Sequence, residues 1–454
     1  MDTIVAISTA PGSSGIGIVR LSGKNSFSIV DKIFKPKNGG DIKGYTIKYG
    51  NIIDENKNII DEVLVSYFIG PKSYTSENMC EINTHGNNII LKQILDLCIK
   101  NGAKIAEPGE FTKRAFLNGR IDLSQAESVI DLINSKSEKE KQSAINQLEG
   151  YLSIEINKIK KNILDIMADI EASIDYPEYD IEEATNKEVL EKANKICIML
   201  EKLEKSFDTG KILRDGVKVA IVGKPNAGKS SLLNAMLKEE RAIVTDVEGT
   251  TRDTIEEFVT IEGILFKIID TAGIRNSEDK IEKIGIDKSK KALREADLVI
   301  AIFDSTKELS TEDIEILNVI KNKTAIILLN KSDLKDNKLK ENTNIIDSKK
   351  DIIEISALKR EGLEELYKKM VELFRIEDIQ TENNSIITNI RHKEAISNAK
   401  KSILKINETI NSGMPIDITA IYFKEAIEEL NKITGENVTE DIINEIFSKF
   451  CLGK

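Results

Sequence analysis

The sequence predicts a multidomain protein in which an α/β domain is inserted into an all-α helical domain, which itself follows an N-terminal α+β domain. Its 454 residues are enough for about three domains. Strand-like apolar patterns fill residues 1–118 and return at residue 216, whereas the segments on either side of residues 216–375 repeat at steps of three and four, which is typical of helices. The predicted domains are therefore residues 1–118, residues 119–215 together with 376–454, and residues 216–375.

The composition favours a cytoplasmic protein. No apolar run reaches the ~18–20 residues that a membrane span needs, and Asp2 stands where a signal peptide carries positive charge. The four cysteines form no CxxC pair, so neither a disulfide framework nor a zinc ribbon is expected. The net charge of −11 falls on the helical segments, because residues 1–118 carry +2 and residues 216–375 carry −2. A surface that binds nucleic acids in general would carry a stripe of basic residues, and none of these segments is strongly basic. A bound RNA would therefore need a local basic patch or a partner protein.

The N-terminal block alternates strand-like runs with turns rich in glycine or asparagine. A helix is expected at Asn88–Lys100, after the last of these runs. The predicted strands are Thr3–Ser8, Ile16–Leu21, Tyr45–Ile52, Val63–Phe68 and Cys80–Asn83. This mixture of strands and helix indicates an α+β domain.

A long amphipathic helix is expected after this block. Tyr176-Pro177 ends it, because proline disfavours helix in the residue before it, and a second helix fits Val189–Phe207. The apolar positions of the long helix are Leu148, Leu152, Ile156, Ile159, Ile163, Ile166, Ile170 and Ile174. Helical periodicity returns near the end of the chain, at Ile386–Ile410, Ile421–Ile433 and Val438–Phe450. Since the opposite faces are polar, these helices are expected to pack as one discontinuous bundle.

Strand and helix patterns alternate between the two helical segments. A helix, Ser231–Leu237, follows the first strand. The predicted strands are Val217–Val222, Thr260–Ile269, Leu298–Asp304, Ala325–Asn330 and Asp351–Ser356. This alternation predicts a doubly wound parallel sheet.

The loop after the first strand of this domain matches the phosphate-binding pattern GxxxxGK[ST] over residues 223–230. Successive backbone N–H groups of such a loop point at phosphates, and the following helix adds a favourable dipole. Lys229 would reach the β- and γ-phosphates, and Ser230 would ligate Mg²⁺. The sequence therefore predicts a P-loop nucleotide site.

Three downstream segments indicate GTP rather than ATP. In Asp270-Thr271-Ala272-Gly273 the carboxylate would support Mg²⁺, and the glycine N–H would sense the γ-phosphate. Asp333 would accept two hydrogen bonds from guanine N1 and N2, which adenine cannot supply. Ser356-Ala357-Leu358 suits backbone contact with guanine O6. We therefore predict a Ras-like G domain whose GTP contacts are Asn226, Ala227, Gly228, Lys229, Ser230, Ser231, Thr245, Asp246, Val247, Glu248, Gly249, Thr250, Thr251, Asp270, Thr271, Ala272, Gly273, Asn330, Lys331, Asp333, Ser356, Ala357 and Leu358.

The catalytic arrangement differs from that of Ras, because Ile274 stands where a glutamine would position the attacking water. Asn226, with the loop Thr245–Asp253, could coordinate a monovalent cation where other GTPases use an arginine. Glu282 could orient the water through a second water, although its spacing alone is more typical of a solvated charge.

These features resemble the MnmE (TrmE) family of tRNA-modification GTPases over essentially the full length of the chain. Two positions depart from the family pattern, since Ser14 and Thr84 stand where the family usually has glycine. Besides the G motifs, the resemblance rests on the loop from Pro11-Gly12 to Arg20, on Pro108-Gly109-Glu110-Phe111 with Arg114-Ala115-Phe116-Leu117-Asn118, and on Phe450-Cys451-Leu452-Gly453-Lys454.

The resemblance implies a dimerising N-terminal domain that binds 5-formyl-tetrahydrofolate, and a potassium-dependent GTPase with Glu282 as its catalytic acid. With an MnmG-like FAD protein, in a heterotetramer, the family modifies C5 of the wobble uridine of certain tRNAs with a folate one-carbon unit. Cys451 would be a nucleophile, a thiol carrier or a small buried hydrophobe. The implied ligands are, for folate, Arg20, Glu81, Arg120 and Lys454; for Mg²⁺, Ser230 and Thr251; and for K⁺, Asn226, Thr245, Val247 and Thr250.

Two other functions remain open on the residues alone. A regulatory GTPase in ribosome assembly would share the G motifs, but it would be expected to carry a basic RNA-binding module. A dynamin-like membrane GTPase would need a basic amphipathic helix with aromatic anchors, and the sequence has no tryptophan.

Overall fold

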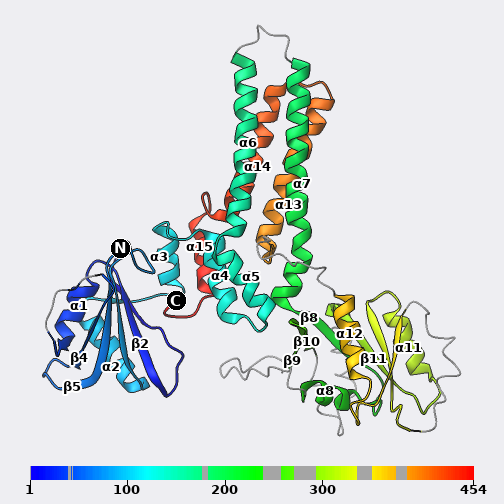
Figure 1. Ribbon diagram of the computed structural model, residues 1–454, viewed down its shortest axis with the longest axis horizontal. Helices are drawn as coiled ribbons and strands as arrows, with labels where there is room; N and C mark the ends of the chain where they lie inside the picture. The colour runs from blue at the N-terminus through cyan, green and yellow to red at the C-terminus, as the bar shows by residue number, and fades with distance from the viewer. Residues whose placement is uncertain are drawn as a thin grey trace. The chain divides into compact units, whose positions relative to one another are not determined.

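The computed structural model describes residues 2–38, 42, 44–175, 182–238, 257–269, 293–334, 350–374 and 386–454 (Figure 1). The chain forms two compact units. The first comprises Met1–Ile133, Gln147–Glu201 and Glu394–Lys454, and the second comprises Asn134–Asn146 and Lys202–Lys393. The helical segments contribute to both units, and the boundaries of the three expected domains stay a prediction.

The first unit contains an α+β sheet domain. Helices α1 (Ser26–Ile33) and α2 (Asn88–Lys100) pack on one face of the sheet, against alternate strand residues such as Val19, Leu21 and Ile82. Strands β1 and β7 are parallel, and the other neighbouring strands are antiparallel. Within the described residues the sheet order is β3-β4-β5-β6-β2-β1-β7, with β1 (Ile4–Ile7), β2 (Ser14–Ser22), β3 (Phe34–Pro36), β4 (Thr46–Ile53), β5 (Ile59–Phe68), β6 (Met79–Gly86) and β7 (Lys104–Ile105). The predicted α+β class is confirmed, and α2 has the predicted bounds.

Helices make up the rest of the first unit and continue into the second. They are α3 (Glu110–Leu117), α4 (Leu123–Asn134), α5 (Glu138–Leu148), α6 (Tyr151–Asp175), α7 (Glu182–Asp215), α13 (Ile390–Asn411), the short 3₁₀ helix η2 (Ile416–Ile418), α14 (Thr419–Thr434) and α15 (Glu440–Ser448). Helix α14 packs along α6, and α15 contacts α3 (Figure 1). The three C-terminal helices lie within four residues of their predicted bounds, and α7 extends beyond both ends of its prediction. Across the described residues, no helix combines the length and apolar character that a bilayer span requires.

The predicted apolar stripe is buried along α6, but its first member belongs to another helix. Leu148 ends α5, and Gly150 separates the two helices with a left-handed φ of +88°. Glycine adopts this conformation without the steric cost that a Cβ would bring. The prediction of one helix from Leu148 is therefore wrong. The stripe residues on α6 are at most 1% exposed: Leu152, Ile156, Ile159, Ile163, Ile166 and Ile170.

Truncating this stripe should destabilise the bundle. Ile163→Ala removes a fully buried side chain and is expected to cost about 2–5 kcal/mol of unfolding free energy, because it leaves a cavity. The neighbouring Leu164 is 53% exposed, so Leu164→Ala is the matched control and should change stability little. The urea midpoint of the far-ultraviolet circular dichroism signal measures both variants. Equal midpoints for the two would contradict the packing described.

The second unit contains the predicted doubly wound sheet. In the described residues its order is β13-β12-β11-β8-β10-β9, and its strands are parallel except for β9, which is antiparallel to β10. Every residue of β12 is buried, as is all of β11 except Asp304. Such strands read as continuous apolar runs because helices cover both faces. The elements are β8 (Val217–Val222), α8 (Lys229–Leu237), β9 (Glu257–Ile261), β10 (Ile264–Ile269), β11 (Leu298–Asp304), α11 (Thr311–Ile320), β12 (Ala325–Asn330), β13 (Asp351–Ile355) and α12 (Leu363–Leu373).

One strand prediction in this unit is wrong. Residues 260–269 are not one strand, because Glu262 and Gly263 both have positive φ, at +48° and +79°. Two such residues make the tight turn of a hairpin, whose twist matches that of the flanking strands. The chain therefore reverses between β9 and β10, which pair antiparallel.

The segment between α4 and α6 packs against this hairpin. The Lys136 ammonium lies 3.5 Å from the ring centroid of Phe258 on β9. A Cβ added at Gly263 would lie 3.2 Å from the side chain of Lys139 on α5. These contacts explain why Asn134–Asn146 belongs to the second unit.

Candidate functional site

The phosphate-binding loop joins β8 to α8 and is pressed against neighbouring strands. A Cβ at Gly223 would lie 2.5 Å from the carbonyl oxygen of Ile302 on β11. One at Gly228, whose φ is +109°, would lie 2.0 Å from the Asn330 amide nitrogen on β12. Asn226 also adopts a left-handed φ, of +63°. The loop thus follows the course that the GxxxxGK[ST] pattern predicts.

The side chain of Lys229 bonds back to the phosphate-binding loop. Its ammonium donates to the carbonyl oxygens of Gly223 and Lys224, at 2.6 and 2.8 Å. Burial lowers the pKa of this ammonium. Among the described residues no side chain caps the N-terminus of α8. A cation beside an uncapped helix N-terminus suits a phosphate group, which supplies the negative charge that two carbonyls lack.

Asn330 connects the phosphate loop to the predicted guanine contacts. Its buried amide donates to the Ala227 carbonyl at 2.8 Å and accepts from the Ala357 N–H at 3.0 Å. The Ser356 hydroxyl donates to Asp333 at 2.8 Å. Three segments that are far apart in sequence therefore meet at the carboxyl ends of β8, β12 and β13.

The local environment of Asp333 favours the ionised form of its carboxyl. The Ser356 hydroxyl, with a smaller contribution from Lys359, lowers the pKa of its carboxyl, which outweighs the effect of burial. The carboxylate is therefore ionised at neutral pH and acts only as an acceptor. Leu358, the last predicted member of this set, is 82% exposed. The geometry supports guanine recognition by Asp333 and the backbone around Ala357.

Two charged contacts beside the loop were not predicted from the sequence. Lys331 pairs with Asp304 at 2.5 Å. Partial burial opposes ionisation of Asp304, but hydrogen bonds from Lys331 and Thr306 outweigh it and lower the pKa of this carboxyl. Lys224 pairs with Asp313 at 2.6 Å, and a cavity of about 230 Å³ opens beside this pair. Asp304 could have been found, because it ends a buried parallel strand at the edge where ligands bind.

Ser231, another predicted nucleotide contact, lies in the first turn of α8. The remaining predicted nucleotide and metal contacts lie outside the described residues. Of the predicted Mg²⁺ and K⁺ ligands, the structure describes Ser230, at the start of α8, and Asn226 in the loop. The predictions outside it are Thr245, Asp246, Val247, Glu248, Gly249, Thr250, Thr251, Asp270, Thr271, Ala272, Gly273 and Glu282.

A second constellation lies on the N-terminal sheet. Arg20 on β2 faces Glu81 on β6 in register, and its Nε donates to Glu81 Oε1 at 2.8 Å. Their neighbours Val19 and Ile82 point toward the helices, so Arg20 and Glu81 lie on the opposite face of the sheet. Two predicted folate residues therefore form one cross-strand pair.

The segment after α15 lies against this pair. The carbonyl oxygen of Gly453 accepts hydrogen bonds from Arg20 Nη1 and from the Ser8 hydroxyl, each at 3.0 Å. Gly453 has a φ of +84°, and a Cβ there would lie 2.4 Å from the carbonyl oxygen of Ile7. Glycine is therefore required at this close approach.

The start of α3 holds the same segment from the other side. The N–H of Phe111 donates to the carbonyl oxygen of Lys454 at 3.2 Å, and that of Gly109 to Cys451 at 3.3 Å. Cys451 itself is exposed, which excludes the alternative of a small buried hydrophobe. Its chemical role stays a prediction.

Tyr74 completes the constellation, and sequence reasoning missed it. The guanidinium of Arg120 lies 4.6 Å from the centroid of its ring, and that of Arg20 lies 5.9 Å away. Arg20 and Arg120 thus share one aromatic ring, and Glu81 and the segment that ends in Lys454 join them through Arg20 and Phe111. Arg20 also lies 5.7 Å from the ring centroid of Phe111 on α3. The only signal was an aromatic residue in a polar loop between two strands.

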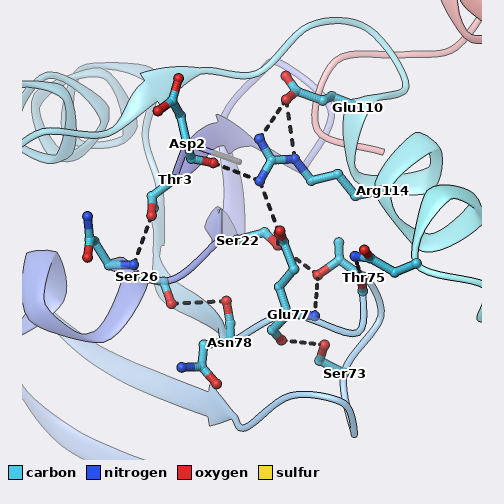
Figure 2. Close-up of polar contacts among 12 residues, drawn as sticks. Asp2, Thr3, Ser22, Ser26, Ser73, Thr75, Glu77, Asn78, Glu110 and Arg114 are labelled. Atoms are coloured by element: carbon cyan, nitrogen blue, oxygen red, sulfur yellow. Dashed lines mark hydrogen bonds and ion pairs between the residues drawn. The ribbon is translucent and has the colours of Figure 1, made fainter.

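A buried network fixes the loop that carries Tyr74 (Figure 2). Arg114 on α3 has a 5% exposed side chain and bonds to Glu77 at 3.0 Å, to Glu110 at 2.8 Å and to the carbonyl oxygen of Asp2 at 2.8 Å. Glu77 in turn accepts from Ser22 on β2 at 2.7 Å. A buried arginine needs such partners, because an unpaired buried charge costs several kcal/mol. The network joins α3, the loop and the sheet.

Two family models match long stretches of the chain. A family model described as the GTP-binding protein TrmE N-terminus matches residues 3–120, and one described as the MnmE helical domain matches residues 123–451. The chain is 50% identical over 459 residues to the tRNA modification GTPase MnmE of Thermoanaerobacter sp. (strain X514), covering 100% of this chain and 99% of that one. The chain belongs to the MnmE family.

The MnmE of Clostridioides difficile (strain 630) is 49% identical over 456 residues, again covering 100% of this chain and 99% of the relative. Among solved structures, the G domain of the T. maritima FeoB iron transporter is 27% identical with a TM-score of 0.27, covering 34% of this chain and 97% of that one. The resemblance to the MnmE family and the predicted fold class are confirmed. As a member of the MnmE family, the chain is a GTP hydrolase.

Proposed function

We propose that this GTPase acts in tRNA modification by a folate-dependent route. GTP hydrolysis would drive modification of C5 of the wobble uridine in certain tRNAs, together with an MnmG-like FAD protein in a heterotetramer. The observation that carries the proposal is that Arg20 pairs with Glu81, shares the ring of Tyr74 with Arg120, and bonds to the Cys451–Lys454 segment.

The chemistry of these residues fits a reduced folate. The two guanidinium groups and the Lys454 ammonium suit the carboxylates of the folate tail, and the Glu81 carboxylate suits the N–H edge of the pterin. When bound, 5-formyl-tetrahydrofolate would supply a one-carbon unit. The protein's own residues would bind and orient it, and Cys451 is exposed in the segment that bonds to Arg20.

The nucleotide site would work through its own cations. We place Mg²⁺ on Ser230 and Thr251, and K⁺ on Asn226 together with Thr245, Val247 and Thr250. K⁺ would offset transition-state charge where other GTPases use an arginine, and Glu282 would orient the attacking water. The hydroxyl of Ser230 and the amide of Asn226 are oxygen donors suited to such ions.

Exposed apolar side chains support a homodimer built on the N-terminal sheet. Ile47 and Tyr49 on β4 are 64% and 44% exposed, and Leu64, the register partner of Tyr49 on β5, is 47% exposed. A contiguous apolar patch of this kind favours association with another protein surface. The tRNA would be held by a local patch or by the partner, because the helical segments are acidic. We place the assembly in the cytoplasm.

Calorimetric titration of 5-formyl-tetrahydrofolate tests the proposal. The full chain is expected to bind, and a version lacking Cys451–Lys454 to bind at least about tenfold more weakly, because it loses the Gly453 carbonyl and the Lys454 ammonium. Leu452→Ala is the matched control, since this side chain is 60% exposed and should contribute little. GTP binding should be equal in all three proteins. Absence of folate binding to the full chain would leave a GTPase without this route.

A further inference from the structure

We propose that Tyr74 is the positioning residue that sets the spacing of Arg20 and Arg120 and thereby the protein's affinity for an anionic folate. The inference rests on the proposed folate site and adds to it a residue that makes the site's two cations act together. It follows from three observations: how Tyr74 is held, what its ring holds, and how few contacts from other described residues constrain Arg120.

Tyr74 is held at both ends of its side chain. Its hydroxyl lies 2.9 Å from the Thr112 hydroxyl on α3, and Thr112 is fully buried. Its backbone belongs to the loop that the Arg114 network anchors, in which Ser73 bonds to the carbonyl oxygen of Glu77 at 2.5 Å (Figure 2). The ring is therefore a fixed platform between α3 and the sheet.

The ring gathers two like charges. A guanidinium is attracted to the negative face of an aromatic ring when it lies within about 6 Å of the centroid. Both Arg20 and Arg120 meet this condition, at 5.9 and 4.6 Å. Like charges held at one ring repel each other, and a shared anion relieves this repulsion when it binds. Tyr74 thus holds the pair ready for a carboxylate.

The two arginines differ in what else holds them. Arg20 also bonds to Glu81 and to the carbonyl oxygen of Gly453, and its guanidinium lies 5.7 Å from the ring centroid of Phe111. Arg120 is an exposed residue that follows the C-terminal end of α3, where Asn118 bonds to the carbonyl oxygen of Thr75 at 2.7 Å. This bond brings the Arg120 backbone beside the loop, and the ring of Tyr74 then fixes its side chain. Removing the ring should therefore free Arg120 more than Arg20.

The test compares three variants of the full chain by calorimetric titration of 5-formyl-tetrahydrofolate. Tyr74→Leu should bind roughly tenfold more weakly, as expected from losing two cation–π contacts. Tyr74→Phe keeps the ring and should bind within about twofold of the unaltered chain. Tyr422→Leu is the matched control, because Tyr422 makes a similar contact with Lys405, 5.3 Å from its ring, in the helical bundle. GTP affinity should be the same in all variants, and both Tyr74 variants should unfold at a slightly lower temperature, because each loses the hydrogen bond to Thr112.

Salt dependence separates positioning from packing. With the arginines dispersed, the folate affinity of Tyr74→Leu should fall less steeply with sodium chloride than that of the unaltered chain. Undiminished binding by Tyr74→Leu would overturn the inference, and so would an equal loss in Tyr74→Phe, which would assign the effect to the hydroxyl. If the unaltered chain binds no folate, the proposed function fails rather than the role of Tyr74 within it.

Discussion

Replacing Asp333 with asparagine should weaken GTP binding by about 10⁴-fold and give the protein affinity for xanthosine triphosphate. The carboxylate, kept ionised by the Ser356 hydroxyl, would accept from both guanine N1–H and N2–H. The NH₂ group of asparagine would face one of these two guanine N–H donors, so both groups would lack an acceptor. A mismatch of this kind gives discrimination of this size. Xanthine carries an oxygen in place of the N2 amine, so the same donor then finds an acceptor.

Competition against a fluorescent nucleotide measures both affinities. Asp351→Asn is the control, because Asp351 lies on β13 and pairs with Lys369 at 3.1 Å, outside the constellation around Asn330. It should leave GTP affinity unchanged. If Asp333→Asn kept its GTP affinity and gained none for xanthosine triphosphate, this assignment of the base site would be incorrect.

Replacing Lys229 with alanine should lower kcat/KM for GTP hydrolysis by about 10²- to 10³-fold. This ammonium is the cation at the centre of the loop, and removing one preorganised stabiliser of transition-state charge costs this much in other enzymes. Lys224→Ala is the matched control, because this lysine of the same loop is paired with Asp313 instead. Phosphate release under steady-state conditions compares the two. Similar losses would mean that the loop's general charge, rather than Lys229, acts on the phosphates.

The pH dependence of GTP binding follows from the same group. Burial lowers the pKa of Lys229 in the free protein, whereas bound phosphate favours the charged ammonium and raises it. Below the lowered pKa the lysine is charged in both states, so affinity is insensitive to this group. As pH rises through that pKa, binding must take up a proton, and GTP affinity falls. Lys229→Ala should lose this dependence.

The parts of the fold that could be predicted are those encoded locally. The phosphate loop, the residues after β12 and the stripe on α6 each occupy a short stretch in which spacing determines geometry. Where the prediction is wrong, one residue changes the backbone direction: Gly150 ends a helix within an unbroken apolar pattern, and Glu262 with Gly263 reverses a strand. A periodic pattern is insensitive to such a residue, because the apolar positions continue on both sides of it.

The N-terminal constellation was less accessible to sequence reasoning, because distant segments build it. The pair of Arg20 and Glu81 depends on a strand register that no local pattern fixes. Tyr74 and Arg114 matter through partners on other elements. The family resemblance predicted the four folate residues Arg20, Glu81, Arg120 and Lys454, but it did not predict Tyr74. The contacts that hold the ring became apparent only from the three-dimensional arrangement.

The contact between Ser8 and Gly453 can form only at the end of the chain's synthesis. The two residues are 445 positions apart. On a ribosome that adds about 5–20 residues per second, Ser8 is made roughly 20–90 s before Gly453. Throughout that interval the growing chain lacks the carbonyl that Arg20 and Ser8 share, while the whole nucleotide-binding unit is being synthesised. A ligand that requires Arg20 and Gly453 together can therefore bind only after the nucleotide-binding unit has been synthesised.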